Sequence, residues 1–212
     1  MPTLQKKLPS LALKEIFEIL ANDIKTLYSC TQVNSEWFCE ASPLLWRDPF
    51  SNKSKTHFAI GTYIQEMSLQ KKQIIKKNFN ISRFESNSLL PYSSFLRSIN
   101  INNFMDAAID FWQNFHKCSQ DCMRIFNIKM IFKLLIQLLL NKSTKIQHFK
   151  FVDLYYNGFP DLGNSLVKLV EIQNGLKYFS LTNTHNSYFL NALQYQSHSL
   201  SYLEFNSVEF KQ

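Results

Sequence analysis

The amino-terminal part of the fold is decided by residues 8–46, which read LPSLALKEIFEILANDIKTLYSCTQVNSEWFCEASPLLW. The i, i+3, i+4, i+7 spacing of an amphipathic helix is met by Leu13, Ile16, Phe17 and Leu20. Asn22 and Asp23 are suited to cap a second short helix. A third helix is expected from about Gln32 to Ala41, where Pro43 should end it. The stretch therefore predicts three short helices.

This segment is rich in apolar side chains for its size. Three helices in fewer than 50 residues bury little surface by themselves, yet the segment contains many Leu and Ile and two Trp. We therefore expect part of its apolar surface to be left for a partner protein.

The spacing of these residues is similar to that of one known family. The positions that carry the similarity are Leu8, Pro9, Ile16, Leu20, Asp23, Leu27, Cys30, Val33, Trp37, Leu45 and Trp46. In this register, and without a gap over roughly residues 8–50, the segment resembles the F-box. One departure is Leu11, where the family usually has Glu.

The resemblance implies binding to the Skp adaptor, which attaches F-box proteins to a cullin ubiquitin ligase. The implied contacts are Leu8, Pro9, Ile16, Leu20, Leu27, Val33 and Trp37. F-box apolar residues also stabilise the helices themselves, so Leu27 and Trp37 are equally candidates for the core. The alternative interpretation of these three helices is a helix-turn-helix DNA-binding domain. It is disfavoured because the third expected helix has Glu36 and Glu40 and lacks Lys and Arg.

A second pattern recurs in the remainder of the chain. Apolar residues at positions 1, 4 and 6 recur in the segments 96–101, 146–151, 176–181 and 200–205. Helical patterns lie between and beside them, over 106–118, 122–140, 162–172 and 188–194. This alternation resembles an irregular leucine-rich repeat, and an α/β layer with a parallel sheet is the alternative.

The expected fold class is α+β or α/β, a three-helix F-box followed by a leucine-rich-repeat-like strand-helix solenoid. The expected domains are the F-box (1–50), a helical and loop bridge (51–95) and a short repeat region (96–212). The whole resembles the F-box/leucine-rich-repeat proteins that form large families in some fungi, in which the repeats hold the substrate.

The strand template also predicts a substrate-binding face. Side chains alternate along a strand, so positions 3 and 5 should face away from the apolar set. The candidate substrate-binding residues are His148, Lys150, Tyr178, Ser180, Tyr202 and Glu204. Parallel strands would align His148, Tyr178 and Tyr202 in one row, and an ordinary mixed surface is the alternative. No polar cap follows the last strand-like segment, so we expect its edge to be covered by a partner or to self-associate.

The net charge of +7 is unevenly distributed. Residues 1–50 carry 5 basic and 6 acidic side chains, residues 51–150 carry 15 and 5, and residues 151–212 carry 3 and 5. The excess includes Lys71, Lys72, Lys76 and Lys77. This region could bind nucleic acid, but a solvated helix face is favoured because no aromatic residues alternate with the lysines.

The sequence contains no recognisable catalytic or metal motif. Its 4 glycines never approach the spacing of a phosphate-binding loop. The best metal candidate, His116 with Cys118 and Cys122, lacks a clear fourth ligand. We therefore expect no metal, no cofactor and no enzymatic activity. A non-catalytic repeat scaffold with a vestigial F-box is a further alternative.

Scattered cysteines and the lack of a secretory signal or a long apolar run favour the cytosol or nucleus, without membrane contact.

Overall fold

The computed structural model describes residues 9–51, 56–79, 86–115, 121–142, 144–152, 160–182 and 188–207. It divides the chain into two compact units, Met1–Arg47 and Asp48–Gln212. Among the helices that are described, none has the length and apolar character needed to cross a membrane.

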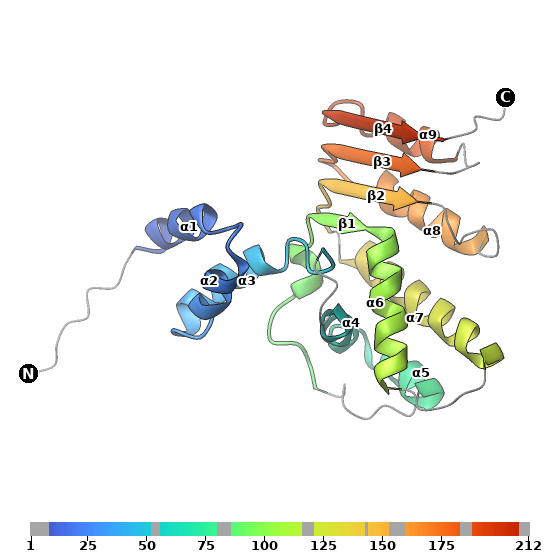
Figure 1. The fold of residues 1–212 in the computed structure, drawn as a ribbon, viewed down its shortest axis with the longest axis horizontal. Helices are drawn as coiled ribbons and strands as arrows, with labels where there is room; N and C mark the ends of the chain where they lie inside the picture. Colours follow the sequence, from blue (N-terminus) through green and yellow to red (C-terminus); the bar gives the residue numbers. More distant parts are fainter. Residues whose placement is uncertain are drawn as a thin grey trace, which may run out of the picture. The chain divides into compact units, whose positions relative to one another are not determined.

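The first unit contains three interacting helices, as predicted. They are α1 (Ser10–Ile19), α2 (Ile24–Cys30) and α3 (Ser35–Leu45) (Figure 1). The predicted cap at Asp23 is present, since its carboxylate accepts a hydrogen bond from the Thr26 amide at 3.1 Å. Asn34 caps α3 in the same way, accepting from the Trp37 amide at 2.9 Å. Both caps satisfy amide donors that have no partner inside the helix.

The end of α3 differs from the prediction. Pro43 was expected to terminate the helix, but it lies inside α3, which continues to Leu45. Proline removes one backbone hydrogen bond from a helix, so other contacts must hold this turn together. The turn persists because Leu44 is buried in the core of the unit and the Trp46 amide donates to the Ser42 carbonyl at 3.1 Å.

A small apolar core holds the three helices together. It consists of Leu13, Phe17, Leu27, Cys30, Ala41 and Leu44, with Leu20, Trp37 and Leu45 packed against it. The rings of Phe17 and Trp37 meet edge to face, with centroids 5.3 Å apart. Each helix contributes to this core, so the unit has a folded interior of its own.

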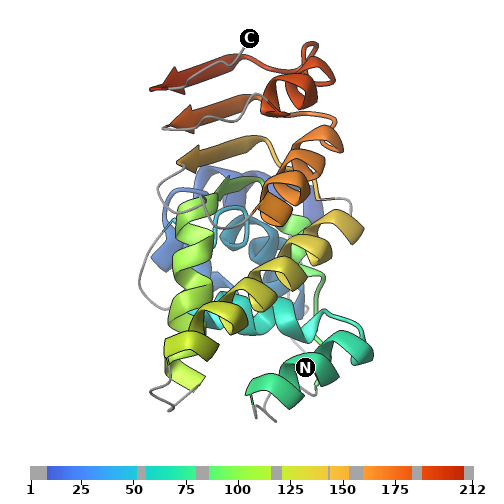
Figure 2. The same cartoon turned by 90° about the vertical axis from the view of Figure 1, so that its right-hand side faces the viewer.

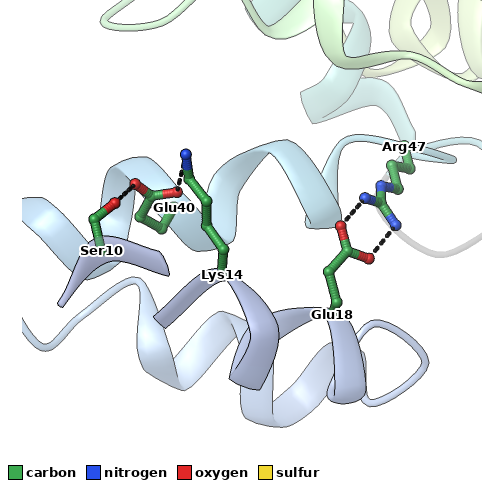
Figure 3. A network of polar contacts seen from close by, with 5 residues as sticks. All are labelled: Ser10, Lys14, Glu18, Glu40 and Arg47. Carbon is green, nitrogen blue, oxygen red and sulfur yellow. Dashed lines mark hydrogen bonds and ion pairs between the residues drawn. The ribbon is translucent and has the colours of Figure 1, made fainter. Parts of the chain in front are cut away.

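Polar side chains also join α1 to α3 and to Arg47, which lies just after α3 (Figure 3). Arg47 donates two hydrogen bonds to the Glu18 carboxylate, one of them at 2.9 Å. This guanidinium lowers the pKa of Glu18 below its ordinary value. Ser10 donates to Glu40 at 3.0 Å. Exposed pairs of this kind stabilise a fold little, so their effect is mainly to fix how α1 lies against α3.

The second unit is built on a four-stranded parallel sheet. Its strands are β1 (Ser98–Asn100), β2 (His148–Val152), β3 (Tyr178–Thr182) and β4 (Tyr202–Asn206), adjacent in chain order (Figure 1). Template position 4 is in register throughout, because Ile99 pairs with Phe149, Phe149 with Phe179, and Phe179 with Leu203. The predicted parallel strands and their register are confirmed.

Helices alternate with these strands. They are α6 (Ile101–Phe115), α7 (Asp121–Asn141), α8 (Pro160–Glu171) and α9 (Tyr188–Gln194). The expected start of α6 at residue 106 is wrong, and Ile101 is helical although the template made it a strand residue. The physical reason is a cap: the Asn100 side chain accepts hydrogen bonds from the amides of Asn102 and Asn103 at 3.0 and 3.3 Å.

The apolar face of the sheet is covered by helices, and α8 and α9 lie on that side (Figure 2). Phe189 of α9 contacts the rings of Phe149, Phe151 and Phe179, with centroid distances between 5.8 and 6.2 Å. Template positions 1, 4 and 6 are buried in the first three segments, whereas Leu203 in β4 is 47% exposed. This layer fixes which side chains point to the opposite, polar face.

Three further helical segments belong to the second unit. They are α4 (Thr56–Gln65), α5 (Leu69–Phe79) and the 3-10 helix η1 (Tyr92–Phe95). The segment 51–95, expected to be a helical and loop bridge, thus contains these three helical segments. Because α4 packs on α6 and α5 on α7, the segment assigned to a bridge is packed with the sheet-bearing part of the chain.

Candidate functional site

The polar face of the sheet carries two rows of side chains that run across the strands. The pairing of β2, β3 and β4 aligns His148 with Tyr178 and Tyr202, which we call the aromatic row. It also aligns Lys150 with Ser180 and Glu204, which we call the charged row. The structure therefore brings together all six residues that the sequence nominated for this face.

The aromatic row has defined geometry. The rings of Tyr178 and Tyr202 are stacked, with centroids 4.9 Å apart and planes 6° apart. His148 lies beside Tyr178 at a centroid distance of 6.1 Å. Tyr202 is 53% exposed. A rigid, partly exposed aromatic surface of this kind is suited to contact a ligand, because little side-chain entropy is lost on binding.

Hydrogen bonds join the two rows at one end. The Tyr178 hydroxyl donates to one Glu204 oxygen at 2.7 Å, and the Asn206 amide donates to the other at 2.7 Å. The bond from Tyr178 lowers the pKa of Glu204 below its ordinary value, and the same bond raises the pKa of Tyr178. Glu204 therefore stays negatively charged at neutral pH. Ser180 is fully buried beneath this face, so its side chain is not accessible to a ligand.

A shallow cavity of about 260 Å³ opens at the other end of the polar face. His148, Lys150 and Tyr178 line it together with Asp48, Ser51, Ser98, Ile99, Asn100 and Asn103. Burial raises the pKa of Asp48, against the effect of a 2.9 Å hydrogen bond from the Ser98 hydroxyl. The cavity can hold a side chain of a ligand, and it offers both hydrogen-bond donors and acceptors.

Six of the nine residues that line the cavity were missed by the sequence analysis. Ser98 and Asn100 occupy positions 3 and 5 of the first template segment, so the template would have found them if applied there. Asn102 was also missed, and its role is structural. Its side-chain amide donates to the Val152 carbonyl at 2.8 Å and accepts from the Val152 amide at 2.9 Å. It thus extends the pairing of β2 beyond the end of β1.

The first unit offers a different kind of surface. Large apolar side chains are exposed on it at Leu11, Ile16, Ile19, Ile24, Tyr28 and Val33, with exposed fractions from 41% at Ile16 to 83% at Ile19. Ile16 and Ile19 lie three residues apart on α1, and Ile24 and Tyr28 four apart on α2, so each pair shares a side of its helix. Exposed apolar side chains that form a contiguous patch are typical of protein-binding surfaces.

The residues assigned to Skp binding fall into three groups. Pro9, Ile16 and Val33 are exposed, and Leu20 and Trp37 are half-buried against the core. Leu27 is fully buried. In this conformation Leu27 stabilises the unit and has no surface to offer a partner. Leu8 lies outside the described residues.

The lysine cluster lies on α5. Lys72 is buried, and its ammonium group donates to the Ser86 carbonyl at 3.2 Å and to the Asn87 side chain at 3.1 Å. One of the four cations is therefore used within the unit itself. This geometry gives no specific support to nucleic-acid binding.

The side chains of the best metal candidate lie outside what the structure describes. His116 and Cys118 lie outside the described residues, and the side chain of Cys122 is likewise outside them. Within the described part of the chain, no cluster of three or more His, Cys, Asp or Glu could hold a metal ion.

Comparison with known proteins adds no relatives: no protein-family model, curated protein or solved structure matches the chain.

Proposed function

We propose that the chain is a non-catalytic substrate adaptor of an SCF-type cullin ubiquitin ligase, acting in the cytosol or nucleus. Its first unit is the F-box that binds the Skp adaptor. Its second unit is an irregular leucine-rich-repeat-type domain that holds a protein substrate on the polar face of the sheet. Such an adaptor contributes proximity, since it raises the effective concentration of substrate near the conjugating enzyme.

One observation carries this proposal. The first unit buries a complete core and still exposes six large apolar side chains between Leu11 and Val33. A unit of this size gains nothing in folding from these exposed residues, whereas burying them against a partner would be favourable. Of the positions that match the F-box pattern, Pro9, Ile16 and Val33 are available for such an interface.

The second unit supports the substrate-binding half. The apolar template residues of β2 and β3 are buried on the helix-covered face, and β2, β3 and β4 present polar or aromatic side chains on the other. Buried glutamines link successive strand-helix repeats: the Gln173 side chain accepts from the Ile146 amide at 2.8 Å, and Gln196 donates to the Val170 carbonyl at 3.2 Å. Repetition of one packing unit is what a leucine-rich-repeat-type domain requires.

The test is capture of a purified Skp adaptor by the full chain, with variants chosen from the exposed positions. Ile16→Asp combined with Val33→Asp should reduce capture at least tenfold, because two charges would be placed in an apolar interface. Cys39→Asp is the matched control, since it adds a charge at an exposed position on α3 that lies outside the set of exposed apolar residues. Capture that survives the double substitution would refute the assigned interface.

A further inference from the structure

The charged row has opposite charges at its two ends. Lys150 on β2 and Glu204 on β4 are separated by Ser180 on β3, which is buried and uncharged. Neighbouring strands lie roughly 4.8 Å apart, so the two charged positions are about 10 Å apart across the sheet. A ligand that satisfies both charges must carry an acidic and a basic group at a similar separation.

Both charges are available to a ligand. Lys150 is exposed at the rim of the cavity, with Asn100 and His148 beside it. Glu204 is oriented by hydrogen bonds from Tyr178 and Asn206, and each of its oxygens retains a lone pair for a further donor. The cavity beside Lys150 is also lined by Asp48, whose carboxylate already accepts a hydrogen bond from the Ser98 hydroxyl.

The separation of the two charged positions and the adjacent aromatic row together indicate the conformation of the ligand. On a β-strand, residues on one side repeat every second position, so they lie about 6.7 or 13 Å apart. Neither distance matches the separation of the two charged positions. In a polyproline II helix residues i and i+3 lie on the same side about 9.3 Å apart, and in an α-helix residues i and i+7 lie about 10.5 Å apart, so both conformations match the row. The stacked rings of Tyr178 and Tyr202 run alongside, and aromatic surfaces of this kind bind polyproline II segments.

We infer that the polar face binds a polyproline II segment of the substrate in which an acidic and a basic residue are three positions apart. The acidic residue contacts Lys150 and the basic residue contacts Glu204. An arginine suits the second position, because its planar guanidinium can lie on the exposed Tyr202 ring while donating to the carboxylate. This inference rests on the proposed substrate-binding role of the sheet and specifies the class of substrate.

The test uses the full chain and fluorescently labelled proline-rich peptides that differ only in the spacing of one Glu and one Arg. Fluorescence polarisation should show that spacing three binds about fivefold more tightly than spacing two or four, the scale of one exposed ion pair. Lys150→Glu should reverse the charge preference, so that an Arg-x-x-Arg peptide binds better than the Glu-x-x-Arg peptide. Lys145→Glu, a change at another exposed lysine just before β2, should keep the wild-type preference.

Equal affinity for all spacings, no binding of any peptide, or an unchanged preference in the Lys150→Glu protein would overturn the inference. The melting temperature of each variant checks that the fold is intact. Skp capture is measured on the same preparations. If the chain captures Skp but shows no preference among the peptides, only the ligand class is refuted. If the chain does not capture Skp, the adaptor function itself is refuted.

Discussion

Phe17 and Ile19 lie two residues apart on α1, but replacing each with alanine should change stability by very different amounts. Phe17 is fully buried and contacts Trp37, whereas Ile19 is 83% exposed. Truncating a buried phenylalanine to alanine costs about 3–5 kcal/mol. Truncating a surface residue changes stability by roughly 0.5 kcal/mol or less. Phe17→Ala should therefore be far more damaging than Ile19→Ala.

The size of the first unit makes this loss decisive. At roughly 0.05–0.15 kcal/mol per residue, residues 9–47 are stabilised by about 2–6 kcal/mol. A loss of about 3–5 kcal/mol is comparable with that total, so Phe17→Ala should leave α1, α2 and α3 largely unfolded while the sheet of the second unit stays intact.

Hydrogen exchange read by mass spectrometry can separate the two units. In the Phe17→Ala protein, peptides from residues 9–47 should lose amide protection and peptides covering β2, β3 and α7 should keep it. The Ile19→Ala protein should match wild type throughout. Wild-type protection of α1–α3 in the Phe17→Ala protein would refute the assigned core.

Three further substitutions test other parts of the structure. Asn34→Ala should lower the free energy of unfolding of the first unit by about 1 kcal/mol through loss of the α3 cap, whereas Asn34→Asp should not; equal urea midpoints for both would contradict the cap. Replacing Tyr178 and Tyr202 together with alanine should abolish substrate capture without affecting Skp capture, and Tyr195→Ala, at another exposed tyrosine, should affect neither; equal loss of both activities would indicate unfolding. Burial raises the pKa of Glu66 above its ordinary 4.5, so the folded state holds a proton that the unfolded chain releases, and stability should fall as pH rises from 4.5 through the raised pKa. Glu66→Gln should flatten that slope of melting temperature against pH, and an unchanged slope would contradict the role of this carboxyl group.

Much of the sheet was predictable because strand periodicity and parallel pairing follow from the positions of the apolar residues in the sequence. Once Phe149, Phe179 and Leu203 were assigned to one template position, the stacking of Tyr178 on Tyr202 followed from register alone. The same reasoning placed Lys150 in line with Glu204. The cap of α2 was similarly predictable from local sequence, since the Asp23 carboxylate accepts from an amide in the first turn of the same helix.

The parts that were not predicted depend on tertiary contacts. Pro43 stays in α3 because Leu44 reaches the core, and no local rule contains that information. Ser180 reads as a surface position in the strand alternation, but it is buried between its neighbours on the sheet. The cavity could not be found because it brings Asp48, distant in sequence, next to Ser98.

The central claim is that the first unit binds a Skp adaptor, and isothermal titration of the purified full chain with purified Skp adaptor tests it most directly. The proposal predicts a 1:1 complex of micromolar or tighter affinity with a negative heat-capacity change, since the interface would bury apolar surface around Ile16 and Val33. The affinity should fall at least tenfold in the Ile16→Asp, Val33→Asp protein and stay unchanged in the Cys39→Asp protein. Absence of any complex between the folded wild-type chain and the adaptor would contradict the claim.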